Sequence, residues 1–216
     1  MRINHRYHTE AEQTALLRCI RQFRAPEAQR DAAWINLLRL SGMRIGEFSR
    51  VTVRQARLAL EQGWLFIPKE HRKGKREDHS VLVTEPMRAD LRALLDLQRQ
   101  CGGSGADDEP LIWSRKGRAM SIRGYQDRYR HWCRKAGIQG SPHWARHTHA
   151  MNIMRRSTAR DPRGIVQAAL GHADISSSGF YTRVSKEELE AALRQVHQPG
   201  RGRRRDMRKV FEGVPA

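Results

Sequence analysis

Close to the end of the chain, a histidine and a tyrosine stand at a spacing that suggests chemistry on phosphate. Leu170-Gly171-His172 is followed nine positions later by Tyr181 (181 − 172 = 9), and His143-Trp144-Ala145-Arg146 lies about one helix upstream. A tyrosine hydroxyl attacks phosphorus when cations and a base surround it. Taken alone, Tyr181 is equally well explained as a half-buried aromatic residue with its hydroxyl at the surface. The residues around it decide between the two interpretations.

Arginines and histidines supply the groups that hold a phosphodiester. Arg146 follows His143 by three positions, and Arg44 lies far upstream within Ser41-Gly42-Met43-Arg44-Ile45-Gly46-Glu47. Guanidinium groups bind phosphate oxygens through paired hydrogen bonds, and imidazoles move protons. Each residue also has an ordinary explanation, such as Glu47 serving as an i,i+3 partner of Arg44 or Arg50 on an exposed helix. Their combination favours a phosphate site.

The overall charge indicates the same kind of partner. The 216 residues carry 41 lysines and arginines against 23 aspartates and glutamates, a formal net charge of +18. Such a surplus favours a polyanion, and nucleic acid is the commonest one. A face for anionic lipid would need an amphipathic, lysine-rich helix or a lipidation signal, and neither is evident. The composition therefore favours binding to nucleic acid.

Helical patterns position the candidate residues. Thr9 and Glu12 form a capping box ahead of an amphipathic helix that ends before Pro26. Residues 27–40 carry apolar side chains at helical spacing until Ser41-Gly42 breaks the helix, which places Arg44 at the start of a short following helix. Further helices are predicted over Glu85–Gln100, Ser121–Ala136, Pro142–Arg155 and Lys186–Val196.

Short β-prone runs complete the predicted fold. Trp64–Ile67 and Ser80–Val83 flank the charged segment Lys69–His79, which indicates a β-hairpin with a long basic tip, and Leu111–Trp113 resembles a brief strand. The fold class is therefore mainly α with a small β-sheet or hairpin (α+β). The length allows one domain, residues 1–197, followed by a basic tail over residues 198–216 that we expect to be flexible.

Histidines on one predicted helix raise the question of a metal site. Two histidines at i and i+4, such as His143 and His147, share a helix face, and His149 is nearby. The glutamate that a zinc-protease motif places after the first histidine is absent, because Trp144 stands there. We therefore expect no metal.

Three cysteines and the first residues indicate the cellular compartment. The wide spacing of the cysteines argues against a disulfide framework, so we expect reduced thiols in or near the core. They are Cys19, Cys101 and Cys133. The polar segment Met1–Glu12 lacks the apolar core of a signal peptide, and no apolar run is long enough to span a bilayer. These features predict a cytoplasmic protein.

The ordered set of motifs resembles the tyrosine recombinases, the phage integrase family. The similarity runs from about Thr9 to about Val184 and includes the segment around Arg44, Lys73-Gly74, the segment from Pro142 to Thr148, Leu170-Gly171-His172 and Tyr181-Thr182. In its length, and in the absence of a separate N-terminal DNA-binding domain, the chain is most similar to the short fimbrial phase-variation invertases. The resemblance implies the catalytic-domain fold of this family.

Catalytic roles follow from this resemblance. It implies Tyr181 as the nucleophile of a 3′-phosphotyrosine intermediate and His143 as the base that removes its proton. The phenol has a reference pKa of about 10 and needs such help at neutral pH. Arg44 and Arg146 would hold the non-bridging oxygens of the scissile phosphate. The chemistry that the resemblance implies requires no metal and no nucleotide cofactor.

Three further residues complete the implied site. His172 would donate another hydrogen bond to the phosphate, and Glu47 would orient the cluster without doing chemistry. Lys73 on the hairpin tip would protonate the leaving 5′-oxygen. Lys75 is the second choice for this acid, and Lys69 lies in the same tip.

The expected partner is double-stranded DNA with inverted-repeat half-sites, inside a bacterial cytoplasm and associated with the nucleoid when bound. We expect a homo-oligomer on DNA, a dimer or tetramer, or pairing with a partner recombinase. A catalytically idle DNA-binding accessory protein on the same fold is the alternative, and a strand-passing topoisomerase is disfavoured by the small size. The DNA-binding candidates are Arg72, Lys75, Arg76, Arg115, Lys116, Arg118 and Arg123.

Overall fold

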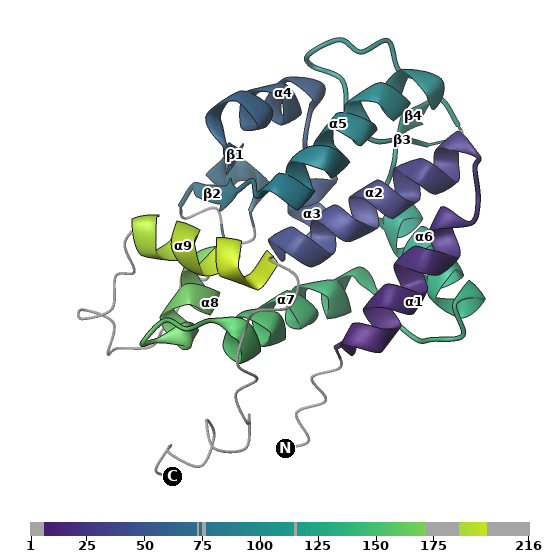
Figure 1. Ribbon diagram of the computed structural model, residues 1–216. Coiled ribbons are helices and arrows are strands. Elements are labelled where there is room, and N and C mark those ends of the chain that lie inside the picture. Colours follow the sequence, from purple (N-terminus) through teal and green to yellow (C-terminus); the bar gives the residue numbers. More distant parts are fainter. Residues whose placement is uncertain (1–6, 73, 75–76, 115, 172–185, 198–216) are drawn as a thin grey trace.

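The computed structural model describes residues 7–72, 74, 77–114, 116–171 and 186–197 (Figure 1). The helices are α1 (Glu10–Arg21), α2 (Pro26–Ser41), α3 (Ile45–Phe48), α4 (Val53–Gln62), α5 (Glu85–Gln100), α6 (Ile122–Lys135), α7 (Pro142–Arg156), α8 (Pro162–Leu170) and α9 (Lys186–His197). Strands β1 (Trp64–Ile67) and β2 (His79–Leu82) form one antiparallel pair, and β3 (Trp113–Ser114) and β4 (Arg118–Ala119) form another. A short 3₁₀ turn, η1 (Lys69–His71), follows β1. The predicted α+β class is confirmed, with two small sheets in the described residues where we expected one.

Local signals in the sequence explain where the helices begin and end. Thr9 accepts a hydrogen bond from the Glu12 amide, and the Glu12 carboxylate accepts one from the Thr9 amide, so the predicted capping box is confirmed. Helix α2 ends at Gly42, whose φ of 65° is the left-handed conformation that glycine adopts without strain. Helices α4 and α8 were not predicted from the sequence pattern.

Helix α2 is the centre of the fold and packs against α1, α5 and α7 (Figure 1). The sequence pattern indicated one apolar face, but α2 is buried around most of its circumference, including the side chains of Trp34, Ile35, Leu37 and Leu38. A helix that is covered on all sides belongs to the interior of a domain. The other helices are therefore arranged around α2.

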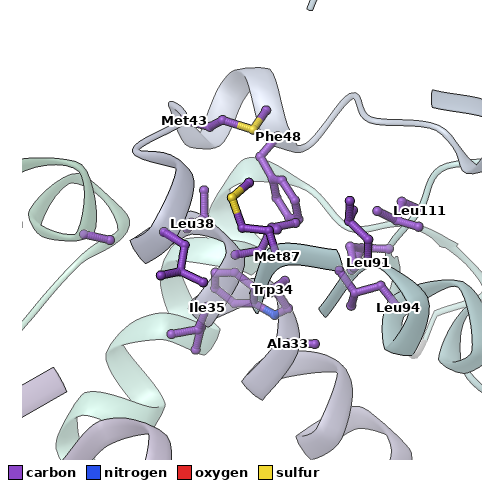
Figure 2. Close-up of a cluster of buried hydrophobic side chains, with 14 of the residues drawn as sticks. Ala33, Trp34, Ile35, Leu38, Met43, Phe48, Met87, Leu91, Leu94 and Leu111 are labelled. Carbon is purple, nitrogen blue, oxygen red and sulfur yellow. The ribbon is translucent and has the colours of Figure 1, made fainter. Parts of the chain in front are cut away.

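The core also fixes the short helix that carries the candidate site. Met43 and Phe48, which flank Arg44 and Glu47 in sequence, are both buried. Figure 2 shows them beside the cluster that contains Trp34 and Met87. Because a densely packed interior resists displacement, these two anchors hold α3 in place.

A buried carboxylate joins α2 to α6. Asp31 is fully buried and accepts hydrogen bonds from the indoles of Trp34 (2.9 Å) and Trp132 (2.8 Å) and from the guanidinium groups of Arg30 and Arg128. A buried charge is tolerated only with such partners. Asp31 therefore fixes α6 against the central helix.

Helix α9 covers the end of the core beside α7 and α8 (Figure 1). Its residues Ala192, Leu193 and Val196 are buried in a cluster with Ile153 and Ile165. The imidazole of the last residue of α9 lies 3.0 Å from the Leu40 carbonyl oxygen and 2.6 Å from the Thr84 hydroxyl. The predicted helix at 186–196 is confirmed within one residue, and it closes the core near the end of α2.

The cysteines and the lengths of the helices can also be compared with the sequence predictions. The three cysteines are unpaired, as predicted; Cys133 is buried, and Cys19 and Cys101 are half-buried. Within the described ranges, the helices are too short or too polar to cross a bilayer.

A buried carboxyl group between α5 and α2 makes stability depend on pH. Asn36 Nδ2 donates to Asp90 Oδ2 at 2.7 Å, and burial raises the pKa of Asp90 to about 7 from an ordinary value near 4. A raised carboxyl pKa means that the folded state binds the proton more tightly than the unfolded state. The contribution of Asp90 is therefore favourable below about pH 4 and is lost as the pH rises through about 7.

We predict that Asp90→Asn stabilises the protein at pH 8 but not at pH 4, because the amide removes the cost of burying an ionised carboxylate. The difference between the two pH values should be about 4 kcal/mol, measured by urea unfolding of parent and variant. Asp96→Asn, at an exposed position of the same helix, is the control. An equal effect of Asp90→Asn at both pH values would contradict the assignment.

Candidate active site

The candidate site is organised around the buried carboxylate of Glu47, which is 2% exposed. Its Oε1 accepts a hydrogen bond from Arg44 Nη1 at 3.0 Å, and its Oε2 accepts one from the Arg44 amide at 3.0 Å. Arg72 Nε lies 3.7 Å from Oε1, within ion-pair distance. Glu47 is thus not the exposed helix partner of the ordinary explanation. It binds two arginines, Arg44 and Arg72, that are distant from each other in the sequence.

A glycine turn places Arg44 beside this carboxylate. Gly42 ends α2, and its amide donates to the Leu38 carbonyl oxygen at 2.9 Å. A Cβ atom at Gly42 would lie 2.6 Å from carbons of both His149 and Leu170. Only glycine allows α7 and α8 to approach this turn so closely. Arg44 then caps α3 as the sequence predicted, with its side chain 32% exposed.

Arg146 on α7 lies next to the same turn and is buried. Its Nη1 donates to the Gly42 carbonyl oxygen at 2.7 Å and its Nη2 to the Leu170 carbonyl oxygen at 2.9 Å. A guanidinium group has five N–H donors, so three remain for another ligand. Burial, and then the positive charge of Arg44, lower the pKa of Arg146 to about 10. Arg146 therefore stays charged at neutral pH. A bound anion would stabilise this charge, which is buried and lies near the positive charge of Arg44.

His143 lies one turn before Arg146 on α7 and is exposed. Its Nε2 is 2.8 Å from Nε2 of His147, so the two imidazoles share a hydrogen bond. His149 lies on the opposite side of the helix, is 2% exposed, and packs against Gly42. The three histidines of the metal hypothesis do not converge, and the described residues contain no cluster of three or more potential metal ligands.

Sequence reasoning missed His79 at the start of β2. Its Nε2 lies 3.2 Å from the Ala169 carbonyl oxygen, and a Cβ atom at Gly171 would be 2.8 Å from its Nδ1. Burial, and then the charge of Arg72, lower the pKa of His79 to about 4, so this imidazole is neutral at pH 7. In the sequence, His79 lies between a charged tip and an apolar strand. Nothing in this local pattern indicates its contact with Ala169, which is 90 positions away.

The DNA-binding candidates divide into two groups. Arg72 was expected in the exposed tip, but its side chain is only 8% exposed and turns inward toward Glu47. Lys116, Arg118 and Arg123 are exposed and line a hollow of about 780 Å³ between α6 and the β3–β4 hairpin. Ile122 at the start of α6 comes within 3.9 Å of the position that a Cβ atom on Gly46 would take. This second group therefore begins beside α3.

Several predicted residues lie outside the described residues. They are Lys73, His172 and Tyr181 of the implied catalytic set and Lys75, Arg76 and Arg115 of the DNA-binding set. The described residues that precede two of them are in contact. Arg72, which precedes Lys73, donates to the carbonyl oxygen of Gly171, which precedes His172. The structure thus unites Arg44, Glu47 and Arg146, and it brings Arg72 and Gly171 into contact.

The arrangement is suited to binding a phosphate group. Three guanidinium groups from three separate segments surround one buried carboxylate, which leaves net positive charge in a partly desolvated place. Fixed donors in such surroundings bind a developing oxyanion more strongly than they would in water. The cluster can therefore stabilise negative charge on phosphate oxygens.

Comparison with known proteins identifies the family. The model of the Phage integrase family matches residues 6–188. Among curated relatives, the tyrosine recombinase XerC of Azotobacter vinelandii is 33% identical over 180 residues, and the tyrosine recombinase XerD of Pseudomonas putida is 32% identical over 180 residues. These matches cover 83% and 80% of this chain and 56% and 55% of the two relatives. The chain belongs to the phage integrase family and spans about half the length of these relatives.

Solved structures share the fold. The crystal structure of XerA recombinase superimposes with a TM-score of 0.61 at 23% identity, covering 89% of this chain and 66% of that chain. The Tn1549 transposon integrase in complex with transposon right end DNA gives a TM-score of 0.63 at 17% identity, covering 87% of this chain and 64% of that chain. The predicted fold of a tyrosine recombinase catalytic domain is confirmed. The closer likeness to fimbrial invertases stays a prediction.

We predict that Glu47→Gln lowers the free energy of unfolding by about 3 kcal/mol, because removing one partner of a buried ion pair leaves its arginines uncompensated. Urea unfolding at pH 7 measures the change. Glu61→Gln, at an exposed position of α4, is the matched control and should change stability by less than about 0.5 kcal/mol. A Glu47→Gln variant as stable as this control would show that the carboxylate does not hold the cluster together.

Proposed function

We propose that this chain is a DNA strand-transferase that cleaves and rejoins DNA through a 3′-phosphotyrosine intermediate at Tyr181. The observation that carries the proposal is the convergence of Arg44 and Arg146 on one buried turn, with Glu47 fixing the first arginine. A protein that only bound DNA would need positive charge at its surface. It would not need a buried carboxylate that orients arginines from distant segments.

The proposed reaction follows from the chemistry of these groups. The Tyr181 hydroxyl attacks the scissile phosphorus, a P–O bond to tyrosine forms, and the bond to the 5′-oxygen breaks. His143 takes the phenolic proton, and Lys73 gives a proton to the leaving 5′-oxygen. A 5′-hydroxyl of another DNA end reverses these steps and rejoins the strand. The phosphotyrosine bond conserves the energy of the original phosphodiester.

Charge stabilisation is the task of the arginines in this scheme. The pentavalent transition state places additional negative charge on the non-bridging oxygens, where Arg44 and the remaining donors of Arg146 bind. His172 adds a further donor. Because both arginines are held by fixed partners before substrate arrives, little reorganisation is needed during the reaction.

The proposed substrate is double-stranded DNA. Two solved structures with the same fold are complexes with DNA: XerH bound to a difH substrate, at a TM-score of 0.59 and 21% identity, and the Tn1549 integrase on transposon end DNA. Exposed Lys116, Arg118 and Arg123 provide a surface for phosphate contacts that begins beside α3. We further propose that protomers pair on inverted half-sites, which supplies sequence selectivity that phosphate contacts lack.

Tyr181→Phe should abolish the covalent protein–DNA adduct and leave DNA affinity nearly intact, because the substitution removes one hydroxyl and no charge. A nicked suicide substrate and a denaturing gel measure the adduct. Tyr7→Phe is the control, since the Tyr7 hydroxyl accepts a hydrogen bond from Arg155 at 2.6 Å, away from Glu47. Adduct at the parent level with the Tyr181→Phe variant would exclude Tyr181 as the nucleophile.

Arg146→Lys should slow cleavage by roughly a hundredfold or more, the scale observed when one transition-state donor is removed. Lysine keeps the charge but lacks the planar fork of donors that serves Gly42, Leu170 and phosphate from one group. Single-turnover cleavage rates measure the effect, with Arg18→Lys on the exposed side of α1 as control. A rate within a few-fold of the parent would remove Arg146 from the site.

A further inference from the structure

We propose that Arg72 is a positioning residue that fastens the tip of the β1–β2 hairpin to the C-terminal end of α8. The inference rests on the proposed function, because the residues that follow its two attachment points are the candidate acid Lys73 and the candidate donor His172. In this view Arg72 does not touch DNA. It holds together the two described segments that precede these candidates in the sequence.

The contacts of Arg72 link three segments. Its Nη1 donates to the carbonyl oxygens of Glu77 at 2.6 Å and Asp78 at 3.3 Å, on the returning side of the hairpin. Its Nη2 donates to the carbonyl oxygen of Gly171, which is 99 positions away in sequence. Its Nε faces Glu47 at 3.7 Å. One planar group therefore joins the hairpin, α3 and the end of α8.

The end of α8 is built to receive this arginine. Gly171 has a φ of 58°, and a Cβ atom there would lie 2.5 Å from Arg72 Nη2. The backbone conformation thus favours glycine, and a Cβ atom at this position would displace the guanidinium. The preceding carbonyl, that of Leu170, is bonded by Arg146. Two arginines neutralise consecutive carbonyl oxygens at the negative end of this helix, where cations are favoured.

The geometry argues against a direct role for Arg72 in binding phosphate. Its side chain is 8% exposed, and both terminal nitrogens are engaged with carbonyl oxygens. Nε is buried and has no hydrogen-bond acceptor among the described residues, so the group is directed at Glu47 and not at solvent. Arg50, by contrast, is exposed and donates to the Glu70 carbonyl oxygen at 3.1 Å. Arg50 contacts the same hairpin without reaching the site, which makes it a matched control.

A substrate with sulfur in place of the leaving 5′-oxygen tests the proposal. A thiolate leaves without being protonated, so cleavage of this substrate does not need the general acid. We expect Arg72→Gln to slow cleavage of the ordinary substrate by at least about tenfold and to slow cleavage of the sulfur substrate much less. Arg72→Lys should behave like Arg72→Gln, because a point charge cannot bridge these acceptors. Lys73→Ala should show the same rescue by sulfur, and Arg50→Gln should match the parent on both substrates.

Two results would overturn the proposal. One is an equal loss on both substrates, which would mean that Arg72 acts on the phosphate or on the fold as a whole. The other is a cleavage rate equal to that of Arg50→Gln. DNA titrations at several salt concentrations add an independent arm: Arg72→Gln should leave the salt dependence unchanged, and a slope smaller by about one would make Arg72 a phosphate contact.

Hydrogen exchange separates this inference from the proposed function. A parent protein that cleaves neither substrate would contradict the proposed function. Arg72 would then still be tested by amide exchange at residues 77–79 and 171, where its partners lie. Faster exchange there in Arg72→Gln than in Arg50→Gln would support the fastening, and identical exchange would overturn it.

Discussion

The rest of the candidate site depends on the buried carboxylate of Glu47. A carboxylate that is 2% exposed requires cationic or hydrogen-bonding partners, and here they are the side chain and amide of Arg44 and the guanidinium of Arg72. This requirement draws the hairpin toward α3 and fixes the direction of Arg44. Because Met43 and Phe48 anchor α3 in the core, the position of the carboxylate is set by packing and not by the charges that it attracts.

Two glycines allow the arginines to gather around this carboxylate. At Gly42 and at Gly171, φ is positive and a Cβ atom would come within 2.6 Å of a neighbouring side chain, so any other residue would be strained and would displace that side chain. Arg146 connects the two glycine turns by donating to Gly42 and to Leu170. The site therefore depends on the close approach of segments at these two turns as well as on the charges of the arginines. A phosphate bound here would replace the solvation that Arg146 loses through burial.

Local patterns predicted most helices but not the contacts between them. The capping box at Thr9 and the glycine after α2 are signals within a few residues, and both were read correctly. Equivalent signals also mark α4, with Thr52 and Gln55 forming a capping box, and they would have located that helix. The inward turn of Arg72 could not be predicted, because its partners Glu47 and Gly171 lie in segments that are distant in sequence, and Gly171 is 99 positions away. The same holds for α2, whose sequence spacing shows one apolar face and gives no indication that other helices cover its remaining faces. The roles of Lys73, His172 and Tyr181 stay predictions, since these residues lie outside the described residues.

A crystal structure of the protein with a cleaved DNA duplex and orthovanadate in place of the scissile phosphate tests directly whether both arginines bind the reacting phosphate. The trigonal-bipyramidal vanadate mimics the transition state. We expect Arg44 and Arg146 to donate to equatorial vanadate oxygens at about 2.7–3.2 Å, with Tyr181 at one axial position and Glu47 still bonded to Arg44. Vanadate bound without contact to either arginine, or without Tyr181, would contradict the proposed function.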